Sequence, residues 1–141
     1  MSHPTIMQNI KRILLIEESP FIVEALQETM QRYGYMLRCA ANAEAGIEAM
    51  RLERFCAVIC NYRLSGMNGL EFFWRSRSLF ERITTILTAS SGDNFLANAA
   101  RVAGVDYFME MPFRVEDLLG FIHAGKPPHQ GHMADFTFLN H

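Results

Sequence analysis

The sequence predicts an α/β fold in which a five-stranded, doubly wound parallel sheet is covered by helices on both faces. Short apolar runs alternate with helical patterns along the chain, as they do in βα units. The runs are apolar almost throughout, which indicates strands that are buried on both faces. A length of 141 residues fits one compact domain around a single core.

The first βα unit carries the clearest local signals. A strand is predicted over Arg12–Glu17 and a helix over Ser19–Tyr33. Ser19 can cap this helix with Pro20 in its first turn, and Gly34 can end it. Apolar residues recur at helical spacing between these limits, so one face of the helix is expected to pack inward.

The same pattern then repeats four times. The remaining strands are expected at Tyr35–Ala41, Cys56–Cys60 (ending at Asn61), Ile83–Thr88 and Val105–Met109, and the remaining helices at Ala43–Arg54 with Asn42 as its cap, at about Gly69–Ser78, after Asp93, and at Val115–His123. Residues 1–10 are interpreted as a polar leader, 11–124 as the domain, and 125–141 as a tail. The tail begins as a Gly- and Pro-rich linker, and its Asp135–Leu139 segment alternates as a short strand does.

Composition excludes several classes of function. The formal net charge of −2 leaves no basic footprint for nucleic acid. No apolar run is long enough to cross a bilayer, and no signal-peptide layout is present, so a cytoplasmic location is expected. The three cysteines, Cys39, Cys56 and Cys60, lack metal-site spacing and are expected to be buried, reduced thiols.

Polar or unusual residues follow the predicted strands at one edge of the sheet. Because ligands bind outside the carboxyl ends of strands in doubly wound sheets, these residues form the candidate site. They are Glu17, Glu18, Asn61, Thr88 and Met111.

The order of motifs around these residues resembles the response-regulator receiver family, from Lys11 to about Ala124. Ile13–Pro20 is similar to the family's first strand with its acidic pair, and Asn61–Gly69 (NYRLSGMNG) to a phosphoacceptor loop that usually reads D-x-x-M-P-G-M-D-G. Ile86–Ala89 matches the strand that carries a hydroxyl, and Ala103–Phe113 the family's A-G-A-x-x-Y-x-x-K-P-F segment. The resemblance implies a flavodoxin-like fold with strand order 2-1-3-4-5.

The resemblance also implies a phosphorylation pocket that has lost its chemistry. In the family an aspartate accepts the phosphoryl group, holds Mg²⁺ with the acidic pair, and is assisted by a lysine. Asn61 stands at the aspartate position and Met111 at the lysine position, so the nucleophile and the cation are both absent. Glu17 and Glu18 are longer than the aspartates that suit octahedral Mg²⁺, which predicts an impaired metal site and no bound cofactor.

We therefore expect a non-enzymatic signalling module that acts through protein partners, independently of phosphorylation. Phe108 falls at the family's switch aromatic and is expected to be core. The candidate interaction face, which the family also uses for homodimers, comprises Asn94, Asn98, Arg101, Tyr107, Asp117 and Phe121, the last lying off its helix's apolar stripe. Two alternatives stay open: phosphorylation of a displaced carboxylate such as Glu17 or Glu18, and small-ligand sensing in the vacated pocket.

Overall fold

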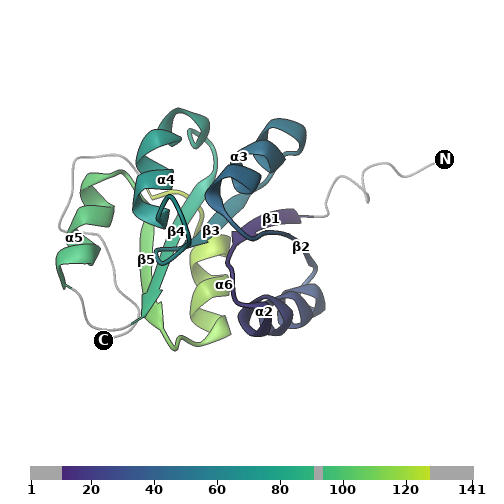
Figure 1. Cartoon of the computed structure of the whole chain (residues 1–141). Coiled ribbons are helices and arrows are strands. Elements are labelled where there is room, and N and C mark those ends of the chain that lie inside the picture. The colour runs from purple at the N-terminus through teal and green to yellow at the C-terminus, as the bar shows by residue number, and fades with distance from the viewer. Residues whose placement is uncertain (1–10, 91–93, 128–141) are drawn as a thin grey trace.

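A computed structural model describes residues 11–90 and 94–127, in which strands and helices alternate along the chain (Figure 1). The strands are β1 (Lys11–Ile16), β2 (Tyr35–Ala40), β3 (Ala57–Asn61), β4 (Thr84–Ser90) and β5 (Tyr107–Met111). The helices are α2 (Pro20–Arg32), α3 (Ala43–Leu52), α4 (Gly69–Arg75), α5 (Asn94–Val102) and α6 (Val115–Ala124), with a short 3₁₀ turn, η1, at Arg77–Leu79. The leader and most of the tail lie outside the described residues.

The five strands form one parallel sheet in the order β2-β1-β3-β4-β5. This order and the parallel pairing confirm the predicted fold class. Ile16 pairs with Cys60, and Asn61 pairs with Thr88, so the carboxyl ends of β1 and β3 lie beside one another and Thr88 of β4 lies beside Asn61.

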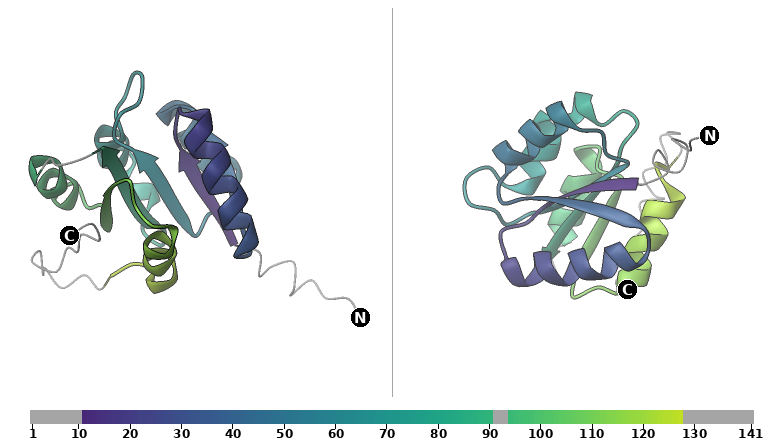
Figure 2. Two further views of the ribbon diagram at one scale, coloured as in Figure 1. Left: turned by 90° about the horizontal axis from the view of Figure 1, so that it is seen from below. Right: turned by 90° about the vertical axis from the view of Figure 1, so that its right-hand side faces the viewer.

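Helices cover both faces of the sheet, α2 and α6 on one side and α3, α4 and α5 on the other (Figure 2). The buried apolar residues divide accordingly into two cores. One joins Ile13, Leu15 and Ile59 to α2 and α6, and the other joins Leu14 and Val58 to the opposite helices. Burial on both faces explains why the central strands are apolar throughout.

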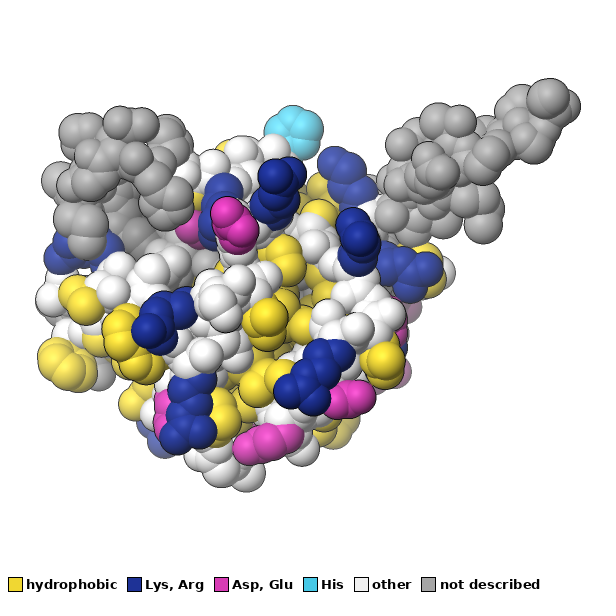
Figure 3. Space-filling model, turned by 90° about the horizontal axis from the view of Figure 1, so that it is seen from above, with side chains coloured by type: hydrophobic (Ala, Val, Ile, Leu, Met, Phe, Trp, Pro, Cys, Tyr) yellow, Lys and Arg dark blue, Asp and Glu magenta, His cyan; other side chains and the backbone are white. Residues whose placement is uncertain are grey.

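Seen from the side that carries α3 and α4, hydrophobic side chains gather in the middle of the surface and Lys and Arg side chains stand around them (Figure 3). Ile47, Met50, Met67 and Leu70 are partly buried against the core beneath these helices. Gly46 lets α3 pack closely on β1, because a Cβ at this position would stand 2.4 Å from Cδ1 of Ile16.

The predicted caps and end of the helices are confirmed by their hydrogen bonds and backbone angles. Oγ of Ser19 accepts from the Ile22 amide at 3.3 Å, and Oδ1 of Asn42 accepts from the Ala45 amide at 2.8 Å. Gly34 follows the end of α2 with a φ of +87°, a conformation that side-chain-bearing residues rarely adopt. These contacts satisfy backbone groups that a helix end otherwise leaves unpaired.

Most element bounds differ from the prediction by one to three residues, and two of these differences have a visible structural reason. The third helix does not reach Ser78, because it ends at Arg75 and the chain turns through η1 so that Phe80 packs edge-on against Phe72, at 5.7 Å between ring centroids. The last strand begins at Tyr107 instead of Val105. The amide of Val105 donates to the Ala100 carbonyl at 3.0 Å, which holds it to the end of α5 and outside the strand ladder.

Cys60 is buried, whereas Cys39 and Cys56 are only partly so.

Within residues 11–90 and 94–127, no helix is long and apolar enough to span a membrane.

Candidate functional site

The carboxyl end of the sheet brings Glu17 and Asn61 into direct contact. Glu17 directly follows β1 and is 5% exposed, and Asn61 ends β3. Nδ2 of Asn61 donates to Oε1 of Glu17 at 2.8 Å. The second carboxylate oxygen of Glu17, Oε2, accepts from the Ser19 amide at 3.1 Å.

Both the nitrogen and the oxygen of the Asn61 side-chain amide form hydrogen bonds. While its nitrogen donates to Glu17, its Oδ1 accepts from the backbone amide of Arg63 at 3.2 Å. A carboxylate could accept from Arg63 but could not donate to Glu17, since an ionised carboxylate is an acceptor only. The surroundings of this position therefore suit an asparagine.

Gly69 keeps the loop after β3 close to the site. A Cβ on Gly69 would stand 2.3 Å from the backbone oxygen of Asn61, which a real side chain cannot do. The Gly69 amide also donates to the Tyr62 carbonyl at 2.9 Å. The absence of a side chain at Gly69 thus allows α4 to begin directly against Asn61.

Glu18 has a different environment from Glu17, although the sequence presents them as a pair. Glu18 is exposed, and its Oε2 accepts from the backbone amide of Ser65 in the loop after β3. This backbone bond, with a smaller contribution from the Ser65 hydroxyl, lowers the pKa of Glu18. The carboxylate thereby links the loop after β1 to the loop after β3.

Thr88 and Met111 are the other two predicted site residues. Thr88 is 2% exposed and is the neighbour of Asn61 in the sheet. Met111 ends β5 and is half-buried. By strand alternation, Asn61, Thr88 and Met111 all point to the face that α2 and α6 cover. A methionine there supplies no charge and no N–H donor for a phosphoryl oxygen.

This arrangement does not fit Mg²⁺. The group that faces Glu17 is an amide nitrogen, whereas Mg²⁺ requires oxygen ligands in near-octahedral geometry. Both glutamates already accept hydrogen bonds from the protein itself. In the part of the chain that the structure describes, no group of three or more His, Cys, Asp or Glu side chains is placed to hold a metal ion.

The predicted interaction face is only partly at the surface. Asn98 is exposed, and Arg101 and Asp117 are partly so, whereas only the backbone of Asn94, at the start of α5, is described. Phe121 is wrongly predicted to lie off the apolar stripe: it is 7% exposed and its ring stacks on Tyr107 at 3.9 Å between centroids. Phe121 is buried because its ring stacks on that of Tyr107, and both rings lie in the core under α6.

Phe108, at the switch position, is 3% exposed and packs in the core beneath α3, α4 and α5.

The sequence reasoning missed two exposed residues of α5. Phe95 is 77% exposed and Val102 is 65% exposed, and with Asn98 they lie on one side of the helix at helical spacing. Leu96, Ala97 and Ala100 occupy the buried side. The sequence of α5 contains two apolar stripes, one with Phe95 and Val102 and one with Leu96, Ala97 and Ala100, and only one of them can face the core.

Known proteins with a similar sequence agree with this architecture. The family model for the response regulator receiver domain matches residues 13–123. The transcriptional regulatory protein CrdR of Helicobacter pylori is 30% identical over 110 residues, which cover 77% of this chain and 51% of that protein. The response regulator protein TodT of Pseudomonas putida is 29% identical over 112 residues, covering 79% and 49%. The chain thus spans about half the length of these curated relatives.

Solved structures share the fold. A CheY-like receiver domain protein from Methanospirillum hungatei superposes with a TM-score of 0.77 at 23% identity, covering 82% of this chain and 93% of that one. A response regulator from Burkholderia pseudomallei, solved with a phosphorylated aspartic acid, gives a TM-score of 0.74 at 21% identity, covering 79% and 66%. With the family model matched over nearly the whole described sheet, the chain belongs to the response regulator receiver domain family of two-component signalling.

Proposed function

We propose that this receiver domain signals by binding a protein partner, without phosphorylation and without enzymatic activity. The observation that carries the proposal is the pairing of Asn61 with Glu17. In an aspartate-bearing receiver this place holds a carboxylate that needs a cation beside it. Here the neutral amide takes the place of one carboxylate and donates a hydrogen bond to the other, so less negative charge is left for a metal ion to compensate.

The chemistry of phosphoryl transfer is also lacking. The nitrogen lone pair of the Asn61 amide is delocalised, so the side chain cannot form an acyl phosphate as a carboxylate does. Met111 offers no charge to offset a transferred phosphoryl group. These two losses act on different steps, nucleophilic attack and charge stabilisation, so restoring one does not restore the other.

The surface that best fits a partner lies on α5. Phe95 and Val102 expose apolar side chains on either side of Asn98, and exposed aromatic residues are typical anchors of protein interfaces. We propose that this side of α5 contacts the partner or a second copy of the domain. Tyr107 and Phe121 support α6 and β5 from within instead of contacting the partner themselves.

Phosphorylation independence is tested by incubating the protein with acetyl phosphate and Mg²⁺ and measuring its intact mass. The expected result is an unmodified mass. A stoichiometric, acid-labile phosphoryl adduct on the wild-type protein would refute the proposal, and peptide mapping would then show whether the exposed Glu18 carries it.

Two variants serve as controls for the same experiment. Asn61→Asp restores the carboxylate but not the cation, so it is expected to label poorly. Asn61→Asp combined with Met111→Lys restores both and is expected to label better than the single variant. Equal labelling of the two variants would show that Met111 does not limit the reaction.

Partner binding is tested by capture from the native cell. Phe95→Ser is expected to lose the partner, while Phe21→Ser is expected to keep it, because Phe21 is equally exposed (80%) but lies on α2. Loss of the partner with both variants, or with neither, would argue against the α5 surface.

A further inference from the structure

A second concave site lies away from the Glu17–Asn61 pair, between the end of α4, η1 and the end of α5. The cavity has a volume of about 370 Å³, within the range of small-ligand sites. It is lined by Phe73, Trp74, Arg77, Phe80, Glu81, Thr85, Val102, Ala103, Gly104 and Lys126. Since Thr85 lies near the start of β4 and Gly104 precedes β5, the cavity is at the amino ends of the strands, at the opposite end of the sheet from Asn61.

The cavity has apolar walls that the domain itself leaves uncovered. Trp74 is 50% exposed and Val102 is 65% exposed, although both belong to helices that pack on the core. The guanidinium of Arg77 stands 4.0 Å from the centre of the Trp74 ring and covers part of one face. The remaining aromatic and aliphatic surface suits an apolar side chain, and Arg77 places a positive charge beside it.

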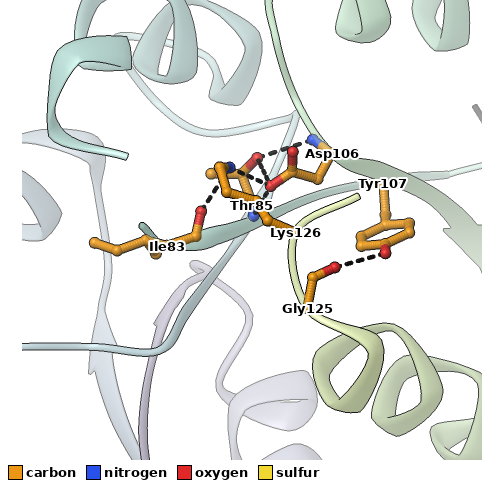
Figure 4. Close-up of polar contacts among 6 residues, drawn as sticks. All are labelled: Ile83, Thr85, Asp106, Tyr107, Gly125 and Lys126. Carbon is orange, nitrogen blue, oxygen red and sulfur yellow. Dashed lines mark hydrogen bonds and ion pairs between the residues drawn. The ribbon is translucent and has the colours of Figure 1, made fainter. Parts of the chain in front are cut away.

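The chain leaves the domain at the wall of this cavity. Nζ of Lys126 donates to the Ile83 carbonyl at 2.8 Å and pairs with Oδ2 of Asp106 at 2.5 Å (Figure 4). The Asp106 side chain is 3% exposed and also accepts from the backbone amide of Thr85 at 2.9 Å. The hydroxyl of Tyr107 donates to the Gly125 carbonyl at 2.7 Å, which holds the preceding residue as well.

These contacts tie the start of the tail to the cavity. Far from being a free linker from Gly125 onward, the tail is held by Lys126 to the residues that directly precede β4 and β5, and Lys126 is one of the residues that line the cavity. Whatever follows Pro127 therefore starts beside the cavity and not at an arbitrary point of the surface.

The sequence that follows contains a matching apolar segment. Asp135–Leu139 reads DFTFL, in which Phe136 and Phe138 would point to the same side of an extended chain and Thr137 to the other. Phe136 lies nine residues after Pro127, and nine extended residues span up to about 30 Å. A short tether of this kind gives an effective concentration on the order of millimolar, so even a weak contact is favoured.

We propose that the Asp135–Leu139 segment docks in this cavity within the same molecule. The aromatic side chains of Phe136 and Phe138 contact Trp74 and Val102, and the carboxylate of Asp135 lies toward Arg77. The segment then covers apolar surface beside the end of α5. This self-docking does not depend on the phosphorylation pocket. Because Val102 also belongs to the proposed partner surface of α5, the docked segment covers part of that surface and competes with the partner there.

Trp74 provides the readout, because it is the single tryptophan of the chain. In the full-length protein, quenching of its fluorescence by acrylamide measures how accessible the ring is. The Phe136→Ser/Phe138→Ser variant is expected to raise the quenching constant about threefold or more and to shift the emission to the red, because it removes the apolar contact that the tether favours over the Trp74 ring. Thr137→Ser, on the opposite side of the segment, is the matched control and is expected to match the wild type.

A change in the cavity wall tests the other half of the contact. Val102→Asp replaces an exposed residue and is expected to increase quenching while the far-ultraviolet circular dichroism is unchanged. Equal quenching in the wild type and the double phenylalanine variant would overturn the proposal. Protection of Trp74 that disappears on dilution would also overturn it, since the segment would then occupy the cavity of a second copy.

Discussion

The amide nitrogen of Asn61 lies 2.8 Å from Oε1 of Glu17, a carboxylate that is only 5% exposed. Burial of a charge is costly unless a partner compensates it. The amide supplies a donor to this carboxylate and accepts from Arg63 with its other end. The buried acid of this pocket thus stands beside a hydrogen-bond donor, where the aspartate of the family would be an acceptor.

Exchanging Asn61 for aspartate is therefore expected to destabilise the domain. Asn61→Asp would place two carboxylates where a hydrogen bond now joins them, and two unit charges 4 Å apart repel by about 4 kcal/mol at an effective dielectric constant of 20. We expect a loss of roughly 2–4 kcal/mol at pH 7, measured by urea unfolding. The loss should shrink as the pH falls toward 5, because protonation of one carboxyl removes the repulsion and its pKa is raised in the folded variant.

Asn42→Asp is the matched control, because it makes the same chemical change at the N-cap of α3, where aspartate caps as well as asparagine. It should leave the free energy of unfolding nearly unchanged. Millimolar Mg²⁺ should recover part of the stability of Asn61→Asp but not alter the wild type. An Asn61→Asp domain as stable as the wild type in EDTA would show that the contact with Glu17 carries no energetic weight.

Phe121 is expected to be a stability residue and not an interface residue. It is 7% exposed and stacks on Tyr107 with an interplanar angle of 19°. Phe121→Ala should therefore lower the free energy of unfolding by about 3–5 kcal/mol, the usual cost of removing a buried phenylalanine. Phe95→Ala, a change at a residue that is 77% exposed, should cost about 0.5 kcal/mol or less. Similar losses for both variants would contradict the burial of Phe121 in solution.

Phe121 also shows where sequence reasoning reaches its limit. The strand order, the caps at Ser19 and Asn42, and the meeting of Glu17 with Asn61 at one edge all follow from local patterns and from the family resemblance. The last helix, however, contains the apolar pairs Leu118-Leu119 and Phe121-Ile122, which fit more than one helical stripe. The buried stripe is Leu118, Phe121 and Ile122, and the stacking of Phe121 on Tyr107, a residue distant from α6 in sequence, helps to hold it there.

The two glutamates illustrate the same limit at the site. Strand alternation could not distinguish Glu17 from Glu18, because β1 is buried on both faces and each side of it leads into a core. The hydrogen bond from Asn61 could not be predicted, because it depends on the register that pairs Ile16 with Cys60. Likewise the bond from the Ser65 amide to Glu18 depends on the path of a loop whose turns are not encoded by any periodicity.

Cys60 should make the stability of the domain sensitive to alkaline pH. Burial raises the pKa of its thiol, and the nearby charge of Glu17 raises it further. The folded protein therefore holds this proton more tightly than the unfolded chain, whose thiols titrate near pH 8.5. Stability is unaffected by this group below about pH 8.5 and is lost as the pH rises above it, by up to about 1.4 kcal/mol per pH unit for one proton.

The measurement is the free energy of unfolding by urea between pH 8 and pH 11, compared for the wild type and Cys60→Ala. The variant is less stable at pH 8 because it loses packing. Its free energy of unfolding should fall less steeply with pH, because up to one proton fewer is released on unfolding. Cys39→Ala should change the pH dependence of the free energy of unfolding less than Cys60→Ala does. Cys39 is only partly buried, so folding raises the pKa of its thiol less. Parallel curves for the wild type and Cys60→Ala would mean that the Cys60 thiolate is accommodated beside Glu17, which its burial should forbid.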